Sequence, residues 1–147
     1  MQWSTLKTMN ELKRNVYIRM KTVHDHQSLD IEAAGVVWLK GGQIIIRYEE
    51  TSADLAGVTT MVKCSEKEIT LIRHGSIRSH QRFILGQRTT GTYDIAQGQL
   101  SIVTVTEQLD ILFNPQGLGQ AVWAYRLWLG GTEVGYFRIT LDVQEDI

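Results

Sequence analysis

Apolar and polar residues alternate along most of the chain in short runs. Near the start, Val16, Ile18 and Met20 are separated by tyrosine, arginine and lysine side chains. A period of two places every second side chain on one face of a β-strand. Runs of this kind, rich in Val, Ile, Thr, Tyr and Phe, predict strands over residues 16–22, 34–39, 43–50, 58–64, 68–73, 77–85, 89–95, 100–106, 109–113, 120–129 and 132–143.

The connections between these runs are short and rich in glycine. The chain has 13 glycines and a single proline. Gly41 and Gly42 separate two runs directly, which is the sequence signal of a two-residue hairpin. A Greek-key sandwich needs some longer crossovers, whereas a meander barrel does not. We therefore predict an all-β fold, a closed or nearly closed antiparallel meander barrel of about 8–10 strands without exposed edges.

The first residues break this pattern. Trp3, Leu6, Met9 and Leu12 recur every three residues. The spacing suits a short helix or 3₁₀ turn that plugs one end of the barrel, and a frayed tail fits equally well. We expect residues 1–13 to be an N-terminal tail or helical plug and residues 14–147 to form a single β-barrel domain.

The hairpin around Gly75 fixes which of its side chains face the core. The large apolar residues of its two runs all occupy odd positions, namely Ile69, Leu71, Ile77, Phe83 and Leu85. Pairing must preserve this parity, so the loop has an odd number of residues. A three-residue loop with glycine at a positive φ meets the requirement. It places Arg73 on the core face, near the end of its strand.

The last hairpin leaves two arrangements open. A two-residue turn at Gly130-Gly131 pairs Phe137 with Ala124 and leaves Trp123 and Tyr125 on the opposite face. A β-bulge in either strand changes that pairing. The sequence does not decide which face of residues 120–129 is interior.

Several short groups of residues, taken together, match a known family. In order, they are Tyr48-Glu49-Glu50, Thr59-Thr60, Ile72-Arg73-His74-Gly75, Phe83 with Gly86, Tyr93 with Gly98, Thr106 with Leu109, and Tyr125. This order resembles the YwiB-like family of bacterial proteins, a domain of unknown function with a lipocalin-like, calycin-type β-barrel, over residues 15–143. That family tends to have Thr-Pro-Tyr-Gly after the tyrosine, where this chain has residues 94–98 as Asp-Ile-Ala-Gln-Gly. The resemblance implies a barrel and supplies no activity, because fold does not fix function.

Composition and charge exclude several classes of protein. The 147 residues are 43% hydrophobic and 21% charged, as in one ordinary globular domain. The net charge of −1 produces no field that recruits nucleic acid or an anionic membrane. No apolar run approaches the roughly 20 residues of a membrane helix, and the start lacks an apolar signal core. A single cysteine, Cys64, fits a reducing compartment. We expect a cytoplasmic protein without membrane or nucleic-acid partners, and leave its oligomeric state open.

Arg73 is the main candidate for a ligand contact. A guanidinium on a core face is costly unless it is paired. It would anchor an anionic head group in the barrel mouth, with hydroxyls from Tyr93 and Tyr125, an apolar contact from Phe83, and Glu50 as resting counter-ion. The alternative, and the commoner role of such an arginine, is a structural ion pair or a side chain that reaches out from the barrel rim.

Three further features each have a functional and a structural explanation. Arg78, His80 and Arg82 form a cationic stripe on one strand face, suited to phosphate contact or simply to solvent. His24-Asp25-His26, with Glu32 downstream, has the spacing of a metal motif but lacks its glycines and its second histidine. We therefore predict no metal site, no cofactor and no catalytic residues, and we expect Cys64 to be a buried thiol.

These observations favour a non-enzymatic module that binds a small amphipathic or anionic molecule in the barrel mouth. The second hypothesis is a structural or interaction protein whose barrel is filled by its own side chains. The interior volume separates these two, because a packed interior leaves no room for a ligand. An enzyme has the least support, since Glu50 and Arg73 are the only candidate groups for chemistry.

Overall fold

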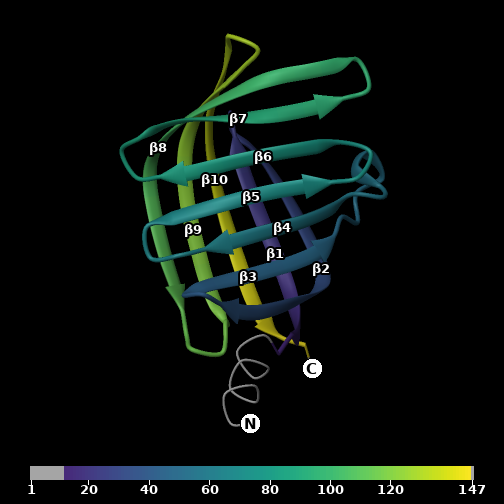
Figure 1. Cartoon of the computed structure of the whole chain (residues 1–147), viewed down its shortest axis with the longest axis vertical. Coiled ribbons are helices and arrows are strands. Elements are labelled where there is room, and N and C mark those ends of the chain that lie inside the picture. The colour runs from purple at the N-terminus through teal and green to yellow at the C-terminus, as the bar shows by residue number, and fades with distance from the viewer. Residues whose placement is uncertain (1–11, 147) are drawn as a thin grey trace.

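The computed structural model describes residues 12–146, and these form a closed barrel of ten antiparallel strands (Figure 1). Each strand pairs with its neighbours in sequence, and β1 closes the barrel against β10. The predicted all-β meander barrel is confirmed. The predicted N-terminal plug falls mostly on residues 1–11, which lie outside the described residues. The strands are β1 (Arg14–His24), β2 (Gln27–Lys40), β3 (Gln43–Glu49), β4 (Thr59–Cys64), β5 (Glu68–His74), β6 (Arg78–Ile84), β7 (Arg88–Ile95), β8 (Gly98–Phe113), β9 (Gly119–Leu129) and β10 (Thr132–Glu145).

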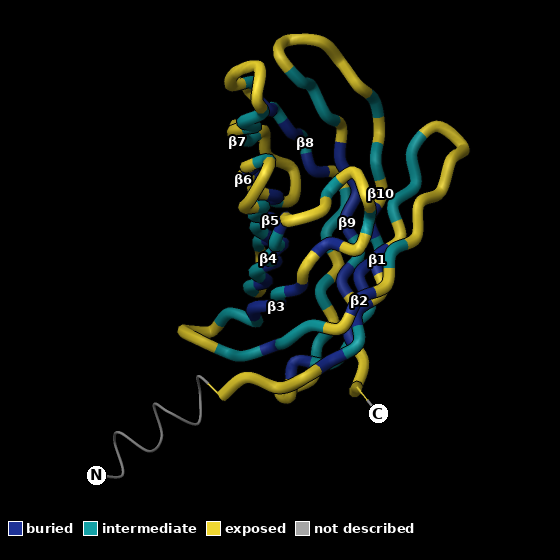
Figure 2. The backbone as a smooth tube through the Cα atoms, turned by 90° about the vertical axis from the view of Figure 1, so that its right-hand side faces the viewer, coloured by how far each residue is buried: buried dark blue, intermediate teal, exposed yellow. Residues whose placement is uncertain are grey.

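The barrel is flattened into two layers that cross at a steep angle. In Figure 1, β3 to β6 run across the direction of β1, β9 and β10. Figure 2 shows the two layers from the side, with β3 to β7 opposite β9, β10, β1 and β2. Inward-facing side chains from both layers form one hydrophobic core, in which Trp123, Phe83 and Ile18 are fully buried. No helix within residues 12–146 is long and apolar enough to cross a membrane.

One long strand replaces two of the predicted runs. The runs over 100–106 and 109–113 belong to the single strand β8. A β-bulge between Thr106 and Gln108 shifts the pairing with β9 at this point. Because a bulge adds one residue to one strand, it reverses the parity of the alternation, and the sequence then looks like two strands.

The Gly75 hairpin has the predicted three-residue loop between β5 and β6. Gly75 has a φ of +143°, and a Cβ there would lie 2.2 Å from the carbonyl oxygen of Gly57, so only glycine fits. Ile69, Leu71 and Phe83 are buried as predicted. The prediction for Leu85 is wrong: it is exposed, because β6 ends one residue earlier and the chain turns away there.

A bulge also decides the last hairpin. Gly130 and Gly131 form the expected turn, but the register shifts between Glu133 and Gly135. Phe137 therefore pairs with Tyr125 instead of Ala124. Trp123 and Tyr125 lie on the interior face of β9. The bulge thus settles which face is interior, and the simple two-residue pairing is wrong.

Candidate functional site

A row of polar side chains crosses the inner face of one layer near one end of the barrel. Direct pairing across β3 to β7 joins Tyr48 to Thr60, Thr60 to Arg73, Arg73 to Ser79, and Ser79 to Tyr93. Directly paired residues carry their Cβ atoms about 4.5–5.5 Å apart, so each side chain neighbours the next. All five are buried or half-buried. The next inward row on β3 to β5 is apolar, so the polar row marks the upper boundary of the core.

Glu50 joins this row at its centre. The residue follows β3 directly, and its backbone N–H donates to the carbonyl of Val58 at 2.9 Å. Its carboxylate Oε2 accepts a hydrogen bond from Thr60 Oγ1 and lies 3.7 Å from Nε of Arg73. The Glu50 side chain is only 1% exposed, whereas that of Arg73 is 22% exposed. The structure therefore holds a buried carboxylate against a guanidinium that reaches the surface.

This ion pair leaves two polar atoms without hydrogen bonds. A separation of 3.7 Å exceeds the 2.7–3.2 Å range of an N–H···O hydrogen bond, so attraction between Glu50 and Arg73 is coulombic. Within the described chain, Oε1 of Glu50 and Nε of Arg73 are both buried and have no hydrogen-bond partner. Such atoms are costly, because burial removes their bonds to water without replacing them.

Both residues line a small cavity of about 70 Å³. Its other walls come from strands β1 and β2 and from the loop after Glu50, which contains the short 3₁₀ turn η1 (Ala53–Leu55). These walls are mostly apolar: Met20, Thr22, Leu29, Ile31, Ser52 and Leu55. Leu29 is 65% exposed, so the apolar wall continues onto the surface. The cavity thus combines a polar floor with an apolar rim.

Two buried tyrosines beside the ion pair stay neutral. Burial raises the pKa of the Tyr48 hydroxyl above its ordinary range, and the negative charge of Glu50 raises it further. That hydroxyl donates to the sulfur of Met20 at 3.6 Å. Burial also raises the pKa of Tyr125, and the positive charge of Arg73 only partly offsets this effect. Neither hydroxyl therefore adds a negative charge to the site.

The predicted ligand contacts separate into two groups. Glu50 and Arg73 line one cavity together, and Tyr93 lies on the same row, two strands away from Arg73. Phe83 and Tyr125 lie within the core, with ring centroids 4.7 Å apart. Their role as ligand contacts stays a prediction.

Sequence reasoning did not single out Thr60, Met20 or Leu29 for this site. The pairing of strands 58–64 and 68–73 was the signal for Thr60, since it places that residue directly across from Arg73. The other two residues lie on β1 and β2, which are distant from Arg73 in sequence, and the curvature of the sheet brings them to the cavity.

Comparisons with known proteins agree with this architecture. Residues 15–141 match the family described as a domain of unknown function (DUF1934). The chain belongs to this family. The uncharacterized β-barrel protein YwiB of Bacillus subtilis is 26% identical to it over 120 residues, which cover 82% of this chain and 83% of YwiB. The crystal structure of the B. subtilis ywiB protein superposes with a TM-score of 0.74 over 99% of each chain, at 19% identity. The resemblance to the YwiB-like family is confirmed, and the structural match shows the fold alone.

The cationic stripe of this DUF1934 protein is partly neutralised. Arg82 binds Glu68 through two hydrogen bonds of 2.8 and 3.0 Å, and the guanidinium lowers the pKa of that carboxyl. Arg78 lies opposite Asp94 in the backbone register of β6 and β7. His80 is exposed between the two arginines. Contact of this face with phosphates stays a prediction.

The His-x-His segment forms the turn between β1 and β2. The ring of His24 stacks on Phe137 with centroids 4.0 Å apart. Glu32 is paired with Arg19 at 2.8 Å and does not approach the histidines as a ligand would. Within residues 12–146, no three His, Cys, Asp or Glu side chains are arranged to hold a metal ion.

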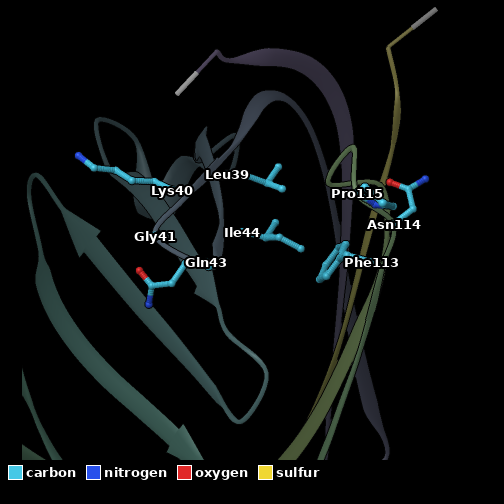
Figure 3. A pocket seen from close by; sticks show the side chains of 9 residues that line it. Leu39, Lys40, Gly41, Gln43, Ile44, Phe113, Asn114 and Pro115 are labelled. Carbon is cyan, nitrogen blue, oxygen red and sulfur yellow. The ribbon is translucent and has the colours of Figure 1, made fainter. Parts of the chain in front are cut away.

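A larger hollow of about 470 Å³ lies at the other end of β3 (Figure 3). It separates the β2–β3 hairpin from the β8–β9 hairpin, and Leu39 and Ile44 point toward Phe113 across it. None of the buried unpartnered polar atoms of the described chain belongs to its lining residues. It therefore lacks the polar anchor that the smaller cavity has, and the smaller cavity is the candidate site.

Cys64 is expected to be unreactive in the folded protein. The thiol is buried on β4, and burial raises its pKa to about 12. Because only the thiolate attacks disulfide reagents, labelling with dithiobis-nitrobenzoate at mildly alkaline pH should give no signal from native protein and one thiol per chain in denaturant. Rapid labelling of the native protein would contradict the burial of this side chain.

Proposed function

We propose that the barrel is a binding module for a small amphipathic molecule whose polar head group enters the Glu50–Arg73 cavity. The observation that carries this proposal is the carboxylate of Glu50, which is 1% exposed, borders the cavity, and has an oxygen without a hydrogen-bond partner in the described chain. Buried unpartnered groups are rare in folded proteins and call for a specific explanation. A ligand that bonds to Glu50 and Arg73 supplies one.

The apolar rim supports an amphipathic ligand. Pockets that enclose a whole small ligand have volumes of roughly 300–1,000 Å³, so a cavity of about 70 Å³ takes a head group and not a whole ligand. The remainder of the molecule would lie along Leu29 and Leu55 at the rim. Burial of apolar surface there contributes roughly 25 cal/mol per Å².

A second candidate is a filled structural barrel, favoured by the packing of its aromatic core. Phe83, Trp123 and Tyr125 are buried below the polar row, and the ring of Phe83 lies 5.8 Å from that of Trp123 and 4.7 Å from that of Tyr125. In that case Glu50 and Arg73 form a structural ion pair, and no small molecule binds saturably. The two candidates therefore differ in a measurable property of the mouth cavity.

Titration of the ¹⁵N-labelled full chain with six-carbon amphiphiles tests the proposal. We use hexanamide, hexanoate and hexylamine, and expect at least one to cause saturable amide shifts around Glu50, Arg73 and Leu29. Leu29→Ser should weaken this binding about fivefold, because it removes apolar contact at the rim. Leu112→Ser is the matched control, since Leu112 is 74% exposed and lies outside the cavity.

Two results would refute the binding proposal. One is the absence of saturable shifts with all three amphiphiles, which supports the filled barrel. The other is equal weakening by Leu29→Ser and Leu112→Ser, which shows that binding does not depend on the mouth cavity.

A further inference from the structure

We infer that the head group taken by the Glu50–Arg73 cavity is neutral and carries both a hydrogen-bond donor and a hydrogen-bond acceptor, as a primary carboxamide does. This inference rests on the proposed binding function and names the chemical class of its ligand. It differs from the expectation from sequence, in which Arg73 anchors an anionic head group and Glu50 is only its resting counter-ion.

The charges of the site argue against an ionised head group. Glu50 and Arg73 are 3.7 Å apart and their charges sum to zero. A carboxylate that enters the cavity places a second negative charge beside a carboxylate that is 1% exposed. An ammonium group likewise places a second positive charge beside the guanidinium of Arg73. Like charges repel strongly where water is excluded, so a neutral head group enters at the lowest cost.

The hydrogen-bonding capacity of the site calls for both a donor and an acceptor. Oε2 of Glu50 already accepts from Thr60, whereas Oε1 has no partner in the part of the chain that the structure describes. Nε–H of Arg73 is likewise without a partner there. A carboxamide N–H donates to the free carboxylate oxygen, and its carbonyl accepts from the guanidinium. One group thus satisfies both atoms.

The size of the cavity agrees with this class. A carboxamide has three non-hydrogen atoms, which suits a cavity of about 70 Å³, well below the roughly 300–1,000 Å³ of pockets that enclose a whole ligand. A phosphate or sulfate group is larger and brings charge. Size and charge therefore select the same kind of head group.

The relative affinities of the three amphiphiles for the unmodified chain test the inference. The tails are identical, so differences in affinity report the head group. We expect hexanamide to bind about tenfold more tightly than hexanoate or hexylamine at neutral pH, because each charged head group meets a like charge in the cavity. Hexanoate or hexylamine binding as tightly as hexanamide, or more tightly, would overturn the inference.

Glu50→Gln tests the electrostatic reason directly. The substitution keeps the shape of the side chain and leaves the charge of Arg73 uncompensated, so hexanoate should become the tightest ligand. Glu68→Gln is the matched control, because Glu68 pairs with Arg82 at 2.8 Å outside the cavity, and the original order should persist. An unchanged order in folded Glu50→Gln would contradict the inference.

Failure of the proposed function and failure of the head-group inference give different results. If none of the three amphiphiles binds, the proposed function fails and the head-group inference falls with it. If binding is saturable and depends on Leu29 but follows a different order, only the head-group inference is wrong. The order measured on the unmodified chain decides this even if Glu50→Gln does not fold.

Discussion

Arg73→Met is expected to lower the free energy of unfolding by about 3–5 kcal/mol, among the largest single-site effects in this barrel. The substitution removes the guanidinium that lies 3.7 Å from Glu50 Oε2 and leaves the carboxylate, which is 1% exposed, without its counter-charge. The remaining hydrogen bond from Thr60 is too little to offset the desolvation of an ionised group. Urea unfolding followed by circular dichroism measures the loss.

The double variant Glu50→Leu/Arg73→Met should recover most of that stability. Replacing a whole buried ion pair with apolar residues of similar volume is often neutral or stabilising, because both desolvation costs vanish together. The pairwise coupling obtained from the four-member cycle should therefore be large and favourable. Glu50→Leu alone should cost less than Arg73→Met, since the Arg73 side chain is 22% exposed and turns toward water.

Arg82→Met is the matched control for this cycle. Arg82 also forms a close pair with a glutamate, but on the outer surface, where such pairs contribute about 0–1 kcal/mol. If Arg73→Met costs no more than Arg82→Met, the Glu50–Arg73 pair does not hold a desolvated charge. Arg73 would then not stabilise a buried carboxylate at Glu50.

The inner position of Arg73 could be predicted because it depends on local rules. The parity of the apolar residues around Gly75 sets an odd loop, and an odd loop sets the face of every residue in β5 and β6. The same rule was insufficient for β9 and β10. There a bulge near Val134 shifts the register, and its only local signal is Gly135, which has a φ of +134° and which parity does not take into account.

The walls of the candidate site depend on contacts that parity does not describe. Parity gives the face of a residue and not its depth along the barrel, so it does not separate Arg73, which lines the cavity, from Phe83 and Tyr125, which lie within the core. Met20 and Leu29 lie on β1 and β2 and reach the cavity only because the sheet from β1 to β5 curls into a barrel. Such contacts follow from the assembled sheet, which no single hairpin specifies.

Trp123→Ala is expected to lower the free energy of unfolding by about 3–5 kcal/mol, as large-to-small substitutions of core aromatic residues do. Trp123 is among the largest fully buried side chains, and its ring lies 5.8 Å from that of Phe83. Removing the indole empties the centre of the core, and rigid strands on both sides limit its collapse. Urea unfolding of the variant measures the effect, with Trp128→Ala, a half-buried tryptophan on the same strand, as the milder control.

Trp123→Phe separates the contribution of the ring from that of its polar atom. The indole Nε1 is buried and has no hydrogen-bond partner among the described residues. Phenylalanine keeps an aromatic ring against Phe83 and removes that unpartnered donor, whose burial costs about 1–3 kcal/mol. The smaller side chain gives up some packing, but the relief of this donor offsets much of the loss. Trp123→Phe should therefore cost less than half as much as Trp123→Ala, and equal costs would show that the indole N–H is bonded in the folded protein.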